Sequence, residues 1–298
     1  MLNHVNTQPT SPKRVVILGA KGFVGSATVK KLMGEDIPFV AIGRDEIDLT
    51  SSSAAEKLAS QLLFDDALVV IAASAPCKTH SMLLENIEMI TSVCDALVKS
   101  PVQQVIYISS DAVYTDSMVK LNESSLAAPA SLHGIMHLAR EQMLQSVVSK
   151  DSLAILRPSL LYGANDPHNG YGPNSFYRLA IAEKEITLFG QGEEQRDHVY
   201  IDDVAEIIYL CLTYRSYGIL NITTGEVTSF ANIINLLNNS LGKLIEVKFK
   251  PRNGAMPHNG YRAFDNATCK QAFSSFQYTM LADGLDKMHH GNSNQIRR

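Results

Sequence analysis

Two histidines four residues apart carry the clearest chemical signal in the chain. His133 and His137 stand in the segment LHGIMHLAR, whose apolar spacing predicts a helix over residues 132–148. Positions i and i+4 share one face of a helix, so the two imidazoles are expected side by side. An imidazole titrates at about pH 6.5 and can exchange protons at neutral pH, and a pair of imidazoles can also bind a metal ion. No third metal ligand is obvious nearby in the sequence, so we expect acid–base chemistry and no metal.

A glycine-rich turn is the second candidate site. It follows an apolar run at residues 14–18 and opens a helical pattern over residues 23–33. Glycines at this spacing permit a tight turn and a close approach of the backbone to a diphosphate, which the helix N-terminus then faces. The turn therefore predicts dinucleotide binding, against the alternative of a merely structural turn. The residues expected at the cofactor are Gly19, Lys21, Gly22, Phe23, Val24 and Gly25.

Strands and helices must alternate to position these residues. Apolar runs predict strands at residues 14–18, 39–42, 67–73, 104–109 and 152–156, and two striped helices are expected at 82–98 and 132–148. This order predicts an α/β fold, a doubly wound parallel sheet with helices on both faces. The apolar stripes are expected in the core, with a dimer interface as the alternative. They comprise Leu83, Ile87, Ile90, Cys94 and Leu97, and Leu132, Ile135, Met136, Ala139, Met143 and Val147.

The second half of the chain predicts a smaller C-terminal, substrate-binding lobe. After about residue 160 the elements shorten, with one strand expected at 186–189, and such a lobe would cover the carboxyl ends of the strands, where ligands bind. We expect a dinucleotide-binding domain at residues 13–160, its sheet completed by parts of the C-terminal half. The lobe is expected at 161–288, and residues 1–12 and 289–298 are expected to be flexible tails.

Composition excludes several classes of protein. The chain has 298 residues, 45% of them hydrophobic, which is ample for a large core. A formal net charge of −4 gives no basic face, so nucleic acid and anionic membranes are poor candidates as partners. The four scattered cysteines indicate reduced thiols. No segment resembles a signal peptide or a membrane span, and we expect a cytoplasmic protein.

Several segments together resemble the extended short-chain dehydrogenase/reductases, the family of NAD(P)-dependent nucleotide-sugar epimerases, dehydratases and reductases. The glycines follow the GxxGxxG spacing of that family, and SSDAVY at 109–114 is similar to its SSxxVYG segment. RPSLLYG at 157–163 resembles its RPxxxYG segment, and RDHVYIDDV at 196–204 its RDxxxVxDV signature. The resemblance covers roughly residues 14–285. It implies a Rossmann domain with a pocket for a nucleotide-diphosphate sugar, and a homodimer.

The resemblance also implies which residues hold the cofactor. Asp48 and Leu49 would lie at the adenine, and the remaining cofactor residues would be Ala72, Ala73, Ser74, Ser109, Pro158 and the ribose-binding His137. Arg44, at the end of the second strand, and Lys21 in the glycine turn favour the 2′-phosphate, and hence NADP(H) over NAD(H). The alternative is that both cations are solvated surface charges, and Asp45 opposes the NADP(H) prediction.

On the substrate side, the resemblance implies two phosphate-binding arginines, Arg196 and Arg252, whose planar guanidinium groups suit phosphate oxygens. The other residues implied at the substrate are Cys77, Asn174, Ser175, Thr187 and Phe189, the last two on the strand at 186–189, whose backbone would pair with the nucleobase. As alternatives, Arg196 would merely pair with Asp197 or Asp203, and Cys77 would be a packed core residue.

The catalytic centre departs from the family pattern. The family uses a Ser or Thr with Tyr-x-x-x-Lys, and here Ser110 fills the first place while His133 and His137 stand at the other two. His133 would replace the tyrosine as acid/base, with Asp111 as a further acid. A metal pair and a silenced regulator or scaffold are the alternatives. Ala112 replaces a carboxylate that dehydratases need, so we predict a reductase or epimerase acting at C4 of a nucleotide sugar, with the reductase slightly ahead.

Overall fold

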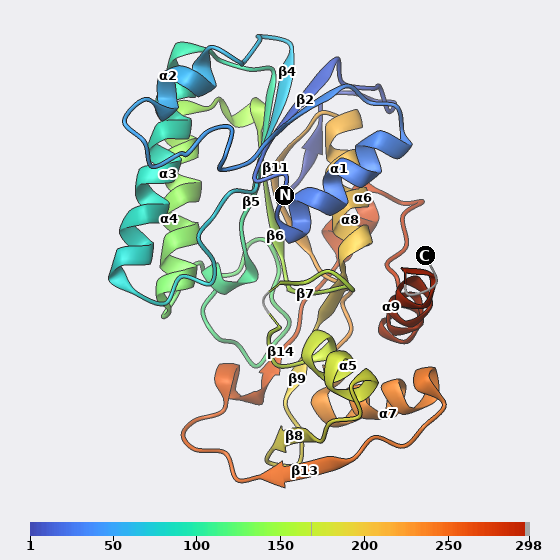
Figure 1. The fold of residues 1–298 in the computed structure, drawn as a ribbon. Coiled ribbons are helices and arrows are strands. Elements are labelled where there is room, and N and C mark those ends of the chain that lie inside the picture. Colours follow the sequence, from blue (N-terminus) through green and yellow to red (C-terminus); the bar gives the residue numbers. More distant parts are fainter. Residues whose placement is uncertain (168, 296–298) are drawn as a thin grey trace.

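The computed structural model describes residues 1–167 and 169–295, and its centre is a seven-stranded sheet (Figure 1). Every strand pair in it is parallel except the pairing of the first strand. In spatial order the strands are β1 (Asn3–His4), β11 (Ser216–Ile222), β6 (Leu153–Pro158), β5 (Gln104–Ile108), β4 (Asp66–Val70), β2 (Arg14–Leu18) and β3 (Phe39–Ile42). The predicted α/β class and doubly wound sheet are confirmed.

Helices cover both faces of the sheet because the β-branched strands are buried on both sides. One face packs against α1 (Phe23–Gly34), α6 (Ile201–Thr213) and α8 (Ala267–Ala272). The other packs against α2 (Ala54–Ala59), α3 (His80–Lys99) and α4 (Leu132–Val147), which stand together in Figure 1. No helix among residues 1–167 and 169–295 is long and apolar enough to cross a membrane.

The chain reverses direction across the sheet at β2. From β2 it crosses to β3 on one side, and it then returns to β4 on the other side, so the loops after β2 and β4 diverge. Such a switch point is where open α/β sheets bind ligands. β4 ends at Val70, three residues earlier than expected, because the N–H groups of Ile71 and Ala72 both turn to the Leu18 carbonyl, at 3.0 and 2.9 Å.

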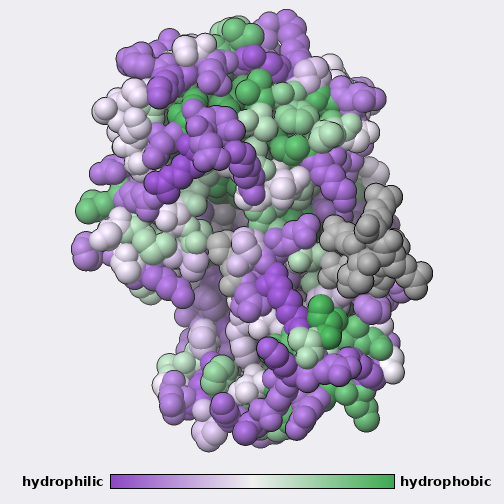
Figure 2. Space-filling model, viewed as in Figure 1, coloured by the Kyte–Doolittle hydropathy of each residue, from purple (hydrophilic) through white to green (hydrophobic). Residues whose placement is uncertain are grey.

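The smaller lobe lies below the sheet in Figure 1 and has a hydrophobic core of its own. Its helices are α5 (Pro173–Ile181), α7 (Phe230–Leu241) and α9 (Leu281–Gln295). β8 (Ile186–Phe189) pairs with β13 (Val247–Lys250), and β9 (Gln195–Arg196) lies between β12 (Thr228–Ser229) and β14 (Tyr261–Arg262). β7 (Leu160–Tyr162) pairs with β10 (His198–Tyr200) beside the sheet. Figure 2 shows the molecular surface hollowed between the sheet and this lobe.

Both segments expected as flexible tails contain regular secondary structure, and residues 296–298 of the second lie outside the described residues. β1 pairs antiparallel with β11, and Leu2 is buried. His4 contacts the Ser216 hydroxyl at 2.8 Å, which fixes the segment to the sheet edge. At the other end, α9 continues through His289 as far as Gln295. The polar composition of these segments gives no sign that the first pairs with a sheet edge or that the second continues a helix.

α4 is rotated relative to the expected apolar stripe. Of that stripe only Met136 is fully buried, and Ile135 is exposed. The buried face instead carries His137, Arg140 and Glu141 with Leu144. Polar groups can be buried when they are hydrogen-bonded, and each of these three side chains has partners in the sheet and the loops, although Arg140 Nε has none among the described residues. The exposed apolar residues remain available for the predicted dimer contact.

Candidate functional site

A cavity of about 850 Å³ lies between the carboxyl ends of the strands and the smaller lobe. The sequence-predicted residues in its wall are Gly19, Lys21, Gly22, Phe23, Val24, Arg44, Asp48, Leu49, Ala72, Ala73, Ser74, Ser109, Ser110, Asp111, His133, His137, Pro158, Asn174 and Arg196. Within the described residues, the wall does not include Gly25, Cys77, Ser175, Thr187, Phe189 or Arg252. The structure thus brings most of the predicted cofactor residues and all of the predicted catalytic residues together at one cavity. Most of the predicted substrate residues do not line it.

The glycine turn leaves its backbone open to a ligand, and it has no space for a side chain at Gly19 or Gly25. Gly19 has a φ of +88°, and a Cβ there would lie 2.8 Å from the Ala72 nitrogen. A Cβ on Gly25 would lie 2.1 Å from the Gly19 carbonyl, so helix and strand pack too closely for alanine. Gly22 caps α1, whose first turn has no acid, and a Cβ there would meet only the Gly19 oxygen. This helix end therefore fits a dinucleotide diphosphate.

The two cations at the adenine end are each paired with carboxylates. Lys21 Nζ lies 2.8 Å from Asp45 and 3.0 Å from Glu46, and these contacts lower the pKa of both acids and raise that of the lysine. Arg44 lies 3.6 Å from Asp48 and 3.8 Å from Glu85. Four carboxylates therefore face the two cations, and Glu46, Asp48 and Glu85 add to the opposition to NADP(H) that Asp45 already predicts.

The loop after β4 is fixed from below by a buried arginine. Arg140 Nη2 donates to the Ala72 carbonyl at 2.6 Å, and Nη1 donates to Asn86 Oδ1 at 3.1 Å. Asn86 in turn accepts from the Ser74 N–H and donates to the Ser74 carbonyl, both at 3.0 Å. These contacts hold the backbone of residues 72–74 at the cavity floor, where the cofactor is predicted.

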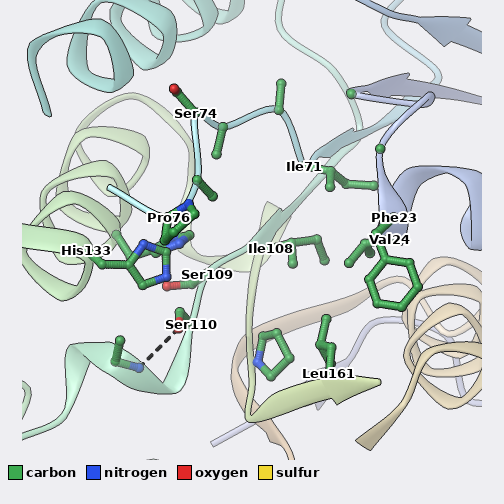
Figure 3. Close-up of a pocket in the computed structure, with 18 of the residues that line it drawn as sticks. Phe23, Val24, Ile71, Ser74, Pro76, Ile108, Ser109, Ser110, His133 and Leu161 are labelled. Carbon is green, nitrogen blue, oxygen red and sulfur yellow. Dashed lines mark hydrogen bonds between the residues drawn. The ribbon is translucent and has the colours of Figure 1, made fainter. Parts of the chain in front are cut away.

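The predicted catalytic residues meet at the carboxyl end of β5. In Figure 3, His133 lies beside Pro76 and close to Ser110, across the cavity from an apolar group formed by Phe23, Val24, Ile71, Ile108 and Leu161. The Ser110 hydroxyl accepts a bond from the Ala112 N–H at 3.1 Å, shown dashed. The rings of His133 and His137 stand perpendicular with centroids 4.7 Å apart. Two imidazoles and a hydroxyl at one wall can hold and move a proton.

Two further residues predicted at this centre, Asp111 and Cys77, are held within the protein. Asp111 is engaged in an ion pair with the buried Arg262, at 2.7 Å, so a role as an acid would require that pair to open. The Cys77 thiol is buried outside the cavity and burial raises its pKa, while its backbone N–H donates to His133 Nδ1 at 3.4 Å. This geometry favours the packed alternative for Cys77.

The metal alternative finds no further ligand. Nδ1 of His137 is hydrogen-bonded to the Tyr107 hydroxyl at 2.8 Å. In the part of the chain that the structure describes, no three His, Cys, Asp or Glu side chains gather in a geometry that could hold a metal ion. A structural zinc site takes four ligands, so two histidines fall short of one.

The two predicted phosphate-binding arginines share one buried carboxylate. Glu194 accepts from Arg196 through one oxygen and from Arg252, at 2.5 Å, through the other. Neither alternative partner of Arg196 is used, because Asp197 accepts from the Ser159 hydroxyl at 3.1 Å and the Gly225 N–H at 2.8 Å. Asp203 accepts from Thr279 instead. Only Arg196 of the pair reaches the cavity wall.

Other substrate-side groups are hydrogen-bonded within the protein. Asn174 Oδ1 accepts from the Gly163 N–H at 2.9 Å, and its amide donates to Asp166 at 2.7 Å. The Phe189 N–H, on the strand expected beside a nucleobase, donates to the Tyr171 hydroxyl at 3.2 Å. Tyr171 lines the cavity, so a nucleobase that pairs with this strand would have to displace its hydroxyl.

Comparison with known proteins identifies the family. The family model described as NAD dependent epimerase/dehydratase family matches residues 15–223. The chain belongs to this family. It is 25% identical, over 91% of its own length and 95% of the other, to an uncharacterized UDP-glucose epimerase of Bacillus subtilis.

Two solved structures share the fold of this epimerase/dehydratase family member. A GDP-L-fucose synthetase from Naegleria fowleri superimposes with a TM-score of 0.83 at 16% identity, covering 99% of this chain and 98% of the other. A UDP-glucose 4-epimerase of Thermus thermophilus in complex with NAD has a TM-score of 0.80 at 21% identity, covering 94% and 99%.

His198, the third residue of the segment that resembles the family's RDxxxVxDV signature, provides a stability test. It is 4% exposed, and neither ring nitrogen has a hydrogen-bond partner among the described residues. Its ring contacts Phe230 with centroids 6.1 Å apart. An unsatisfied buried polar group costs about 1–3 kcal/mol, so we expect His198→Phe to stabilise the protein by that order in urea unfolding at pH 7.

The pH dependence checks the cause. Burial lowers the pKa of His198 to about 3, so between pH 6.5 and 3 the unfolded state binds a proton that the folded state does not. Stability then rises with pH, and this group costs about 1.4 kcal/mol per unit as the pH falls below 6.5. The advantage of His198→Phe should therefore grow on acidification. His4→Phe is the control, because both His4 nitrogens are bonded, and it should destabilise.

Proposed function

We propose that this family member is an NAD(P)-dependent reductase or epimerase that acts at C4 of a nucleotide-activated sugar. The observation that carries the proposal is one continuous cavity lined by the glycine turn, by Ser110 and His133, and by Arg196. A bound nicotinamide would exchange a hydride with C4. His133 would move the proton at the C4 oxygen, and the Ser110 hydroxyl would hold that oxygen. The UDP-glucose epimerase and NAD complex among the similar proteins support both ligand classes.

The test is turnover with two substrates. Purified protein is incubated with NAD(H) or NADP(H) and either UDP-glucose or a 4-keto-6-deoxy nucleotide sugar. An epimerase forms the C4 epimer with no net change in nicotinamide absorbance, whereas a reductase consumes reduced cofactor. Binding of cofactor and nucleotide sugar without turnover of either substrate would instead support the silenced regulator or scaffold.

Cofactor preference is the finer part of the proposal. Lys21 and Arg44 favour NADP(H) by sequence, yet four carboxylates face these two cations and oppose a 2′-phosphate. We expect NADH to bind the wild type at least as tightly as NADPH. In Asp45→Asn/Glu46→Gln, which frees Lys21, NADPH affinity should rise about tenfold while NADH affinity is unchanged. Calorimetric titration measures both.

Asp65→Asn is the matched control for this titration, because it removes a similar exposed lysine pair at Lys13, outside the cavity wall. Tighter binding of NADPH by the wild type would restore the preference that the sequence predicts.

The proposed homodimer would use α3 and α4, which expose Leu84, Val98 and Ile135.

A further inference from the structure

A buried tyrosine contacts the histidine that stands in place of the family's lysine. Tyr107, on the central strand β5, is 1% exposed, and its hydroxyl lies 2.8 Å from Nδ1 of His137 on α4. His137 is 6% exposed and lines the cavity. Burial raises the pKa of Tyr107 above its ordinary value, so the phenol keeps its proton and can donate it.

We propose that Tyr107 is a positioning residue that holds His137 as a neutral imidazole with its proton on Nε2. The place of the family's lysine thereby becomes an uncharged hydrogen-bond donor to the ligand in the cavity. This inference rests on the proposed function, which it deepens. The tautomer follows because a nitrogen that accepts the phenol proton cannot carry one of its own, and a neutral imidazole carries one proton.

The surroundings of His137 oppose a positive charge on it. Burial is the main cause that lowers its pKa well below 6.5, and the neighbouring His133 and Arg140 add to the effect. His133 faces it edge-on from the preceding helical turn, Arg140 lies on the same helix, and Tyr107 approaches from the sheet. A protonated His137 would place a second cation beside the buried Arg140.

The tyrosine is itself rigidly held. The Arg140 guanidinium lies over the Tyr107 ring, 5.4 Å from its centroid, and Arg140 is bonded to the Ala72 carbonyl. A line of contacts therefore joins the cofactor loop at Ala72 to His137 through Arg140 and Tyr107. In the family pattern a lysine charge lowers the pKa of a tyrosine. A free imidazole needs no such help at neutral pH, so a neutral residue at 137 is consistent with histidine at 133.

The experiment compares Tyr107→Phe with Tyr278→Phe, using the cofactor and the nucleotide sugar that the wild type turns over. Tyr278→Phe removes another hydrogen-bonded hydroxyl, bound by the Thr223 N–H at 3.2 Å and outside the cavity wall. Tyr107→Phe should lower kcat about tenfold, with KM for the nucleotide sugar little changed, because the imidazole loses its anchor. Tyr278→Phe should leave both constants unchanged, although both variants lose some thermal stability. Equal kcat in the two variants overturns the proposal.

A second readout does not depend on turnover. ¹⁵N spectra of histidine-labelled wild type with NADH, assigned by comparison with His137→Gln, should show His137 as the Nε2–H tautomer that does not titrate between about pH 5 and 8. In Tyr107→Phe the Nδ1 resonance should shift. An imidazolium or an Nδ1–H tautomer in the wild type contradicts the proposal. The expected tautomer in a protein without turnover would instead refute the proposed function alone.

Discussion

Replacing His133 with alanine is expected to reduce turnover of the nucleotide sugar by about 10²- to 10⁴-fold, the usual worth of a general acid or base. Cofactor affinity should change little, because the glycine turn and the loop at Ala72 are predicted to hold the dinucleotide independently of this ring. Steady-state kinetics and a calorimetric titration with NADH measure the two effects. Added imidazole should restore part of the lost activity to His133→Ala, which a purely structural loss would not allow.

The control variant is His80→Ala, since His80 is exposed at the start of α3 and lies outside the cavity wall. His133→Tyr should stay poorly active, because an unassisted phenol has a pKa of about 10 and His137 brings it no charge. Full activity in His133→Ala would move the acid–base role elsewhere. The next candidate would be His258, which lines the same cavity and lies 2.5 Å from Asp116.

The parallel sheet could be predicted because its strands are short, continuous apolar runs. Arg14–Leu18 and Phe39–Ile42 have the expected bounds, because such apolar runs in a parallel sheet carry no polar alternation. Ile186–Phe189, which pairs with β13 outside this sheet, also has the expected bounds, although its side chains alternate between buried and partly exposed. The predicted buried face of α4 was wrong because the prediction assumed that only apolar residues are buried. Arg140 and Glu141 face inward through specific partners, and the partners come from distant segments.

The position of the glycine turn and of Ser110 at the cavity could likewise be predicted, since each follows a strand directly, whereas the roles of these residues stay predictions. The contacts at the substrate end could not be predicted, because no sequence motif shows which residues bind its side chains. Glu194 stands two residues before Arg196 and binds both predicted arginines, and Tyr171 reaches the N–H of Phe189 from a loop. Tyr107 gave one usable signal, a hydroxyl in a buried strand whose only other polar side chain is Gln104 at its start.

Glu141→Gln is expected to destabilise the fold by about 3–5 kcal/mol, because it breaks a buried ion pair and leaves a charge behind. Glu141 is 0% and Arg157 4% exposed, and the guanidinium binds both carboxylate oxygens, at 2.9 and 2.6 Å. The same carboxylate accepts from the Ser109 hydroxyl at 2.5 Å. It therefore connects α4 to the ends of β5 and β6, next to the part of the cavity that Ser109 and Ser110 line.

Urea unfolding of Glu141→Gln measures this loss against a typical total of about 5–15 kcal/mol. Glu56→Gln, which breaks the exposed pair with Lys99, should change stability little. The double variant Glu141→Gln/Arg157→Met tests the cause: with the stranded guanidinium gone, it should be more stable than Glu141→Gln alone. If the double variant is instead the less stable of the two, the loss of stability in Glu141→Gln comes from packing. The charge of the Glu141–Arg157 pair would then not be what positions Ser109.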